Sequence, residues 1–225
     1  PGFITANVDN DPNGIFTYYP AGAQFGYALL WTMLPITLAL IVVQEMCARM
    51  GAVTGKGLSD LIREEFGLRL TVIIMLLLVL VNFGNVIGEF SGIAGSLQLF
   101  HVSKYISIPI CRVLVWFLAV RGDYKRVEKI FLVASMFYFT YIIAGVLAHP
   151  GWRVAAEATI HLPAMSVLRD HAYVFMVVTV VGTTIAPWMQ FYLQSSVVEK
   201  GITARDYAGS RLDVIVGSIF TDVVA

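Results

Sequence analysis

The sequence predicts an all-α membrane protein, and three observations lead to that class. Hydrophobic residues make up 58% of the 225 residues and charged residues only 13%, whereas a soluble domain carries about 25% charged residues. The apolar residues form several runs of about 20, the length that a helix needs to cross a bilayer. The alternating pattern of outer-membrane strands is absent, and a lipid-facing backbone must satisfy its own hydrogen bonds, which favours helices.

We expect a single transmembrane domain in a chain that is a piece of a longer protein. The sequence begins with Pro1 rather than methionine and stops within an apolar run at Ala225, so we expect a missing C-terminal remainder. The predicted spans are about 1–21, 25–48, 70–99, 105–120, 127–148 and 171–198, followed by a partial seventh span at 212–225.

The basic residues predict the orientation of these spans. Eleven of the 15 Lys and Arg residues fall on one side: Arg49, Lys56, Arg63, Arg69, Arg121, Lys125, Arg126, Lys129, Lys200, Arg205 and Arg211. Basic loops stay in the cytosol, so we expect a cytosolic N-terminus in a plasma (inner) membrane protein. The formal net charge is zero, which argues against nucleic acid and leaves the lipid bilayer as the expected surrounding.

Two of the predicted spans are interrupted. The first contains Asn-Asp-Pro-Asn-Gly at 10–14 and the sixth contains Gly-Thr-Thr-Ile-Ala-Pro at 182–187. Proline removes a backbone donor, and a broken helix inside a membrane persists only where protein, water or a ligand satisfies its backbone. Breaks five spans apart are typical of inverted-repeat transporters that bind substrate at the breaks. Two packing kinks would give the same pattern, because proline and glycine are common in membrane helices.

Asp11, at the first break, is the strongest candidate for binding an ion. A carboxylate at the middle of a membrane costs about 2.5–3.5 kcal/mol on insertion scales, which makes it a functional candidate. Carbonyl groups freed by the break would complete an oxygen cage for a hard cation. The same carboxylate would also suit the N-cap of the following half-helix. Asp9 either joins this site or lies on a water path to it.

The second break offers oxygen atoms of several kinds. Thr183 and Thr184 have hydroxyl and carbonyl oxygens, although such hydroxyls more often bond back to their own helix. Ala186 offers its carbonyl only, while Asn13 and Gln190 lie near the breaks as direct or outer ligands. We therefore expect a metal site at the two breaks and no bound cofactor.

Other polar residues divide into a pathway candidate and structural groups. Glu89 lies deep in the third span, where an acidic residue indicates a proton or ion pathway. Glu45 and Arg49 are four residues apart and predict an ion pair on one helix face. The four histidines have no metal-ligand spacing, and the motifs of hydrolases and phosphate-binding enzymes are absent, so we do not expect an enzyme.

Several segments resemble the NRAMP divalent-metal transporters. They are Pro-Gly-Phe-Ile-Thr-Ala at 1–6 with Asp-Pro at 11–12, Gln-Glu-Met-Cys-Ala-Arg-Met-Gly-Ala-Val-Thr-Gly-Lys-Gly at 44–57, Tyr-Lys-Arg-Val-Glu-Lys-Ile-Phe at 124–131, and Ala-Pro at 186–187 with Tyr-Leu-Gln-Ser-Ser at 192–196. The resemblance runs over essentially the whole chain. It implies a LeuT-like inverted-repeat fold with broken helices 1 and 6, and import of divalent cations, often coupled to protons.

The first of two departures from the family pattern falls at the breaks. The family has Asp-Pro-Gly-Asn at the first break, so Asp11 matches while Gly14 stands where the family has a metal-binding Asn. At the second break, Thr183 stands at the family's Ala and Ala186 at its metal-binding Met; a shift of one residue would place Pro187 at that Met instead. The thioether ligand is absent in either register.

The second departure concerns the family's proton route. Gln194 stands at the position of a His in the sixth span, and Val86 at that of an Asp in the third, while Glu89 matches. We therefore expect Glu89 and Gln194 to line a proton or ion pathway with weak or no proton coupling.

The resemblance is greatest to the NRAMP-related magnesium transporters. An all-oxygen site suits Mg²⁺ or Mn²⁺, and Mg²⁺ usually keeps several of its waters. We expect import of a largely hydrated Mg²⁺, and also of Mn²⁺, by alternating access. The alternatives are a proton-coupled Mn²⁺/Fe²⁺ importer of the same family, a LeuT-like symporter of organic solutes, and a membrane enzyme or passive subunit.

Overall fold

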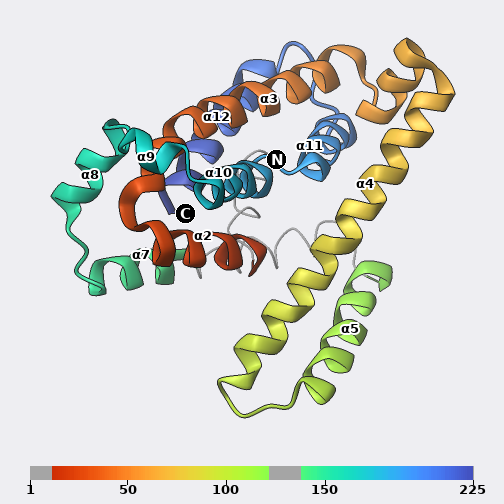
Figure 1. Ribbon diagram of the computed structural model, residues 1–225. Helices are drawn as coiled ribbons and strands as arrows, with labels where there is room; N and C mark the ends of the chain where they lie inside the picture. The colour runs from red at the N-terminus through yellow and green to blue at the C-terminus, as the bar shows by residue number, and fades with distance from the viewer. Residues whose placement is uncertain (1–11, 122–137, 225) are drawn as a thin grey trace.

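A computed structural model describes residues 12–121 and 138–224, and every regular element within those ranges is a helix (Figure 1). The predicted all-α class is thereby confirmed. In chain order the helices are α2 (Pro12–Phe25), the 3₁₀-helix η2 (Gly26–Thr32), α3 (Met33–Thr54), α4 (Leu58–Gln98), α5 (Lys104–Arg121), α7 (Tyr138–Leu147), α8 (Trp152–Ile160), α9 (Met165–Leu168), α10 (His171–Thr184), α11 (Pro187–Glu199) and α12 (Tyr207–Val224).

Three helical stretches in the described residues are long and apolar enough to cross a membrane: Gly14–Thr54, Leu58–Gln98 and His171–Glu199. The first of them joins α2, η2 and α3 without a loop, so the two spans expected at the N-terminus follow one another through the 3₁₀ turns of η2. The division of the whole chain into seven spans stays a prediction.

Glycines in the left-handed region set two of the turns. Gly55 has a φ of 65° at the C-cap of α3, and its N–H donates to the carbonyl of Gly51 at 2.9 Å. Gly67, with a φ of 81° and a ψ of 169°, bends α4 between the polar turn at 58–66 and its long apolar part. A side chain with a Cβ would be strained at both positions, so glycine allows these turns.

Two groups of buried apolar residues hold α3 between the N-terminal and C-terminal helices. The first joins α2, η2, α3 and α10 and consists of Ala21, Leu29, Ile36, Tyr173 and Val180. The second joins α3, α11 and α12 and consists of Ala48, Ala52, Leu193, Val197 and Val214. Because α3 contributes to both groups, it connects the part of the molecule around α2 and α10 with the part around α11 and α12.

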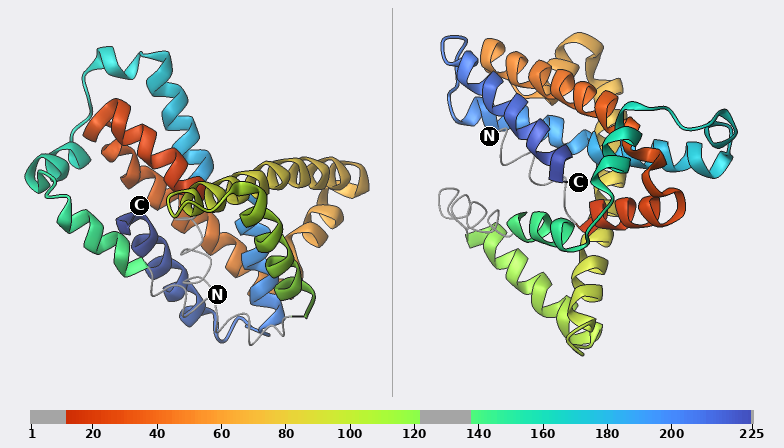
Figure 2. Two further views of the ribbon diagram at one scale, coloured as in Figure 1. Left: turned by 90° about the horizontal axis from the view of Figure 1, so that it is seen from below. Right: turned by 90° about the vertical axis from the view of Figure 1, so that its left-hand side faces the viewer.

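Helices α4 and α5 form a hairpin that projects from the rest of the molecule (Figures 1 and 2). Much of its apolar surface is open: only 6% of the residues in the most hydrophobic window of α4 are buried. A water-soluble chain rarely exposes so large an apolar face. Lipid, or protein outside the described residues, is the surrounding that such a face requires.

Candidate functional site

The sixth predicted span is interrupted between α10 and α11. Helix α10 ends at Thr184, and α11 begins at Pro187. The two residues between them leave the helical region, Ile185 with φ −108° and ψ 58° and Ala186 with φ −66° and ψ 131°. The break predicted at 182–187 is therefore present. It is two residues long, because Gly182 and both threonines still belong to the last turn of α10.

The position of Pro187 explains why backbone oxygen becomes available at this break. In an uninterrupted helix the carbonyl of Thr183 would accept from the N–H of residue 187, but proline has none. Proline is well placed at the first position of α11, where an N–H would in any case lack a helical partner. The carbonyl of Thr183 therefore lacks its usual helical donor, because the backbone nitrogen of Pro187 has no hydrogen. This is the kind of oxygen that a hard cation can use.

Helix α2 packs against the end of α10 through hydroxyl groups. The hydroxyls of Thr17 and Thr183 lie 3.0 Å apart, and the hydroxyl of Tyr18 lies 2.8 Å from that of Thr184. The Thr184 hydroxyl also donates to the carbonyl of Val180 at 3.0 Å, so Tyr18 is the donor in their shared bond. Thr184 therefore bonds back to its own helix, which was one of the two expectations, whereas the hydroxyl of Thr183 bonds to the neighbouring helix.

The contacts along α2 and α10 show that the two helices run in opposite directions. Thr17 meets Thr183 at one end, and the ring of Phe25 packs edge-on against that of Tyr173 near the other, with centroids 5.3 Å apart. From the first of these contacts to the second, residue numbers increase along α2 and decrease along α10. The first turn of α2 therefore lies level with the interruption after Thr184.

The predicted ligands can now be located. Gly14 is buried in the first turn of α2, Thr183 is half-buried, and Ala186 is buried between α10 and α11. Asn13 belongs to the first turn of α2. Asp11, like Asp9, lies outside the described residues, so its role stays a prediction. Within the described residues, no three His, Cys, Asp or Glu side chains gather to hold a metal ion.

Buried amide side chains lie on the other side of the break, where α3 packs against α11. Gln194 is fully buried; its Nε2 donates to the carbonyl of Lys56 at 2.8 Å, while its Oε1 has no hydrogen-bond partner in the described part of the chain. Gln44 and Gln190, also buried, have no partner for either amide atom among these residues. Buried polar groups are nearly always hydrogen-bonded, so these amides require partners beyond the described residues, such as water.

Glu89, the predicted pathway residue, is half-buried on α4. This helix contacts both α2 and α11. Helix α11 begins at the break in the sixth span, whereas the predicted break at 10–14 falls partly outside the described residues. The predicted ion pair between Glu45 and Arg49 is present, with Nη2 and Oε2 3.8 Å apart.

Thr17 and Tyr18 were not predicted from the sequence. The signal that could have indicated them is a hydroxyl side chain within two turns of a break in an apolar span.

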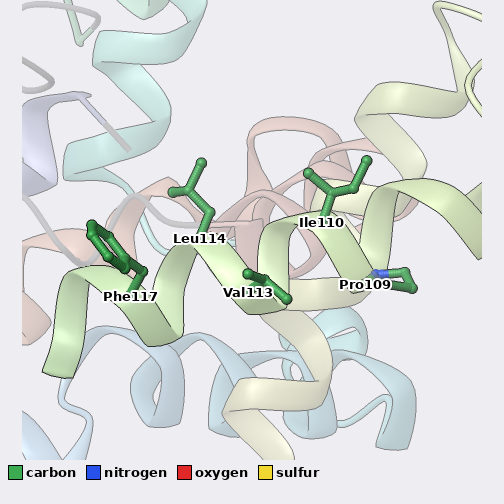
Figure 3. A pocket seen from close by; sticks show the side chains of 5 residues that line it. All are labelled: Pro109, Ile110, Val113, Leu114 and Phe117. Carbon is green, nitrogen blue, oxygen red and sulfur yellow. The ribbon is translucent and has the colours of Figure 1, made fainter. Parts of the chain in front are cut away.

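A hollow on the surface of α5 does not suit a cation. A cavity of about 620 Å³ opens along one face of α5 and is lined by Pro109, Ile110, Val113, Leu114 and Phe117 (Figure 3). All five side chains are apolar, so this surface has no group that could replace the water around a charged ion. The interrupted region between α10 and α11 stays the better candidate.

Comparison with known proteins gives one family for essentially the whole chain. Residues 2–225 match the sequence family Nramp, which is described as natural resistance-associated macrophage protein-like. The chain is also similar to proteins named divalent metal cation transporter MntH. It is 31% identical to one from Pediococcus pentosaceus over 206 residues, which cover 88% of this chain and 44% of that protein.

In two further relatives the match likewise covers less than half of the relative's length. The identity is 30% over 201 residues with a MntH of Levilactobacillus brevis, covering 88% of this chain and 43% of that protein. It is 28% over 222 residues with MntH 1 of Pseudomonas aeruginosa, covering 94% and 48% respectively. The chain thus spans a little less than half the length of these curated relatives.

Proposed function

We propose, from the premise that this chain belongs to the Nramp family, that it forms part of a transporter importing a largely hydrated Mg²⁺, and also Mn²⁺, by alternating access. Three helical stretches able to cross a membrane, together with this family, make it a multi-pass membrane protein. The observation that carries the proposal is the hydroxyl pairing of Thr17 with Thr183 and of Tyr18 with Thr184. It joins the start of α2 to the interruption in the sixth span.

The ion is expected to bind where the two interruptions meet. Asp11 precedes the first turn of α2 and supplies the negative charge, while Asn13 and Gly14 follow it on that turn. From the other side, Thr183 and Ala186 supply carbonyl oxygen. An oxygen set with one carboxylate is typical of Mg²⁺, which keeps several of its waters and binds through one or two carboxylates.

Selectivity among divalent ions follows from the absent sulfur ligand. Ala186, and Pro187 in the alternative register, replace the methionine that the resemblance places at this break. Met189 lies in the first turn of α11 and is 1% exposed, as expected of a side chain that packs in the core. Soft thioether ligands select transition metals, and their loss favours hard ions such as Mg²⁺ and Mn²⁺.

The route inward is expected to pass Gln194 and Glu89. The buried amides of Gln44, Gln190 and Gln194 keep polar atoms that no described side chain satisfies, as a hydrated path requires. The amide of Gln194 neither takes up nor releases a proton near neutral pH, which supports weak or absent proton coupling. The membrane potential alone adds about 2.3 kcal/mol per charge per 100 mV to inward movement. A divalent cation can therefore accumulate without a proton.

Uptake by the purified protein in proteoliposomes containing a pH-sensitive dye tests the proposal. We expect Mg²⁺ and Mn²⁺ to enter with little acidification, and Asp11→Ala to abolish uptake without preventing insertion. Asp60→Ala is the matched control, because Asp60 is an exposed carboxylate in the first turn of α4. A strong preference for Cd²⁺ together with acidification would overturn the proposed ion and coupling, and would favour the proton-coupled importer.

A further inference from the structure

A groove of about 350 Å³ lies between the end of α3 and the start of α12, away from the helix breaks. Four of the residues that line it are polar or charged: Glu45 and Arg49 on α3, and Tyr207 and Arg211 on α12. The spacing of each pair is one helical turn, so each pair lies on one helix face. The groove therefore has polar groups on both walls.

The one acidic residue of the groove already has partners within it. The hydroxyl of Tyr207 donates to Oε1 of Glu45, and Arg49 Nη2 lies 3.8 Å from the other carboxylate oxygen. The side chain of Arg49 nevertheless stays 57% exposed. Arg211 is exposed and makes no ion pair or side-chain hydrogen bond with the described residues. Two guanidinium groups against one carboxylate leave the groove with a net positive charge.

The rest of the groove is apolar and lies deeper along both helices. Its apolar lining consists of Ile41, Val42 and Ile215. Val42 is 55% exposed and precedes Glu45 by one turn, while Ile215 follows Arg211 by one turn. Because α3 runs toward the side predicted to be cytosolic and α12 starts from it, the arginines lie near that membrane surface and the apolar wall lies toward the bilayer interior.

We propose that this groove binds an anionic glycerophospholipid of the cytosolic leaflet. Its phosphate would accept hydrogen bonds from Arg49 and Arg211, and an acyl chain would follow the wall formed by Val42 and Ile215. Arginine forms paired hydrogen bonds with phosphate oxygens, and basic pockets between membrane helices on the cytosolic side suit anionic headgroups. A zwitterionic lipid would place its own cationic group near the arginines, which disfavours it. A soluble phosphate ester has no acyl chain to contact the apolar wall, so it should bind less tightly.

Titration of the purified, detergent-solubilised protein with short-chain phosphatidylglycerol, followed by native mass spectrometry, tests this site. We expect saturable binding that is tighter than that of phosphatidylcholine of equal chain length. Arg211→Gln should weaken binding of phosphatidylglycerol about fivefold, since a basic residue near an anionic surface contributes about that factor. Arg211→Lys should retain most of the affinity because it keeps the charge.

The control variant is Arg205→Gln, which removes an exposed arginine from the connection between α11 and α12, outside the groove. Arg49→Gln is a second, independent variant and should also weaken binding. The proposal is overturned if phosphatidylglycerol binds equally to Arg205→Gln and to both groove variants, or if phosphatidylcholine binds as tightly. Equal affinity for glycerol phosphate would also overturn it, because the site would then recognise a free phosphate ester.

Discussion

Replacing Gly51 should loosen the packing of α11 on α3. A Cβ at this position would lie 3.1 Å from the carbonyl oxygen of Gln194 and 3.2 Å from both its Cγ and the Cγ1 of Val197. Such distances are shorter than normal van der Waals contact, so backbone or side chains must move. Overpacking of this kind costs typically about 1–3 kcal/mol. Small residues allow this close approach between membrane helices.

Gly84→Ala is the matched comparison, because Gly84 lies inside α4 and a Cβ there would have no atom within 4 Å. Alanine is favoured over glycine inside a helix by about 1 kcal/mol, and this gain is common to both variants. The difference between Gly51→Ala and Gly84→Ala therefore isolates the packing cost. We expect Gly51→Ala to be the less stable of the two by about 1–3 kcal/mol.

Unfolding in mixed micelles, followed by circular dichroism as the denaturing detergent is increased, measures this difference. The midpoint for Gly51→Ala should fall below that for Gly84→Ala, and Gly51→Leu should lower it further. Equal midpoints for the alanine variants would refute the reasoning, since they would mean that α11 does not pack closely on Gly51.

Three further changes follow from individual contacts. Thr184→Val keeps the shape but removes the hydrogen bond with Tyr18, and should lower stability in thermal unfolding by about 0.5–1.5 kcal/mol; an unchanged unfolding temperature would show that the hydroxyl contact is dispensable. Tyr173→Phe leaves Trp31 Nε1 without its acceptor at 2.8 Å and should cost a similar amount in the same assay, whereas wild-type stability would contradict it. Gln194→Leu should reduce Mg²⁺ uptake in proteoliposomes by making the path less polar, and uptake at the wild-type rate would remove this residue from the route.

The class of the fold and one of the breaks could be predicted because they depend on local chemistry. A chain with few charges and long apolar runs must satisfy its backbone internally, which gives helices. Pro187 lacks an N–H wherever it lies, so the interruption of the sixth span follows from the residue itself. The pair of Glu45 and Arg49 also depends only on spacing along one helix.

The remaining features depend on contacts between distant segments. Thr17 and Thr183 are 166 residues apart. Although each lies near a predicted break, nothing in the sequence around them indicates that they pair with one another. The same holds for the groove between Glu45 and Tyr207, which forms only when α12 packs on α3. The burial of Gln44 and Gln190 likewise results from helix packing rather than from their sequence neighbours. The position of Asp11, the residue on which the ion site depends, stays a prediction.

Calorimetric titration of the purified protein with Mg²⁺ and with Mn²⁺ tests the ion site most directly. We predict saturable binding of both ions that Asp11→Asn abolishes, because the amide removes the negative charge while keeping the shape. Asp60→Asn, the variant of an exposed carboxylate on α4, should bind both ions as the wild type does. Unchanged binding by Asp11→Asn would contradict the account, since the ion would then be held elsewhere than at the two helix breaks.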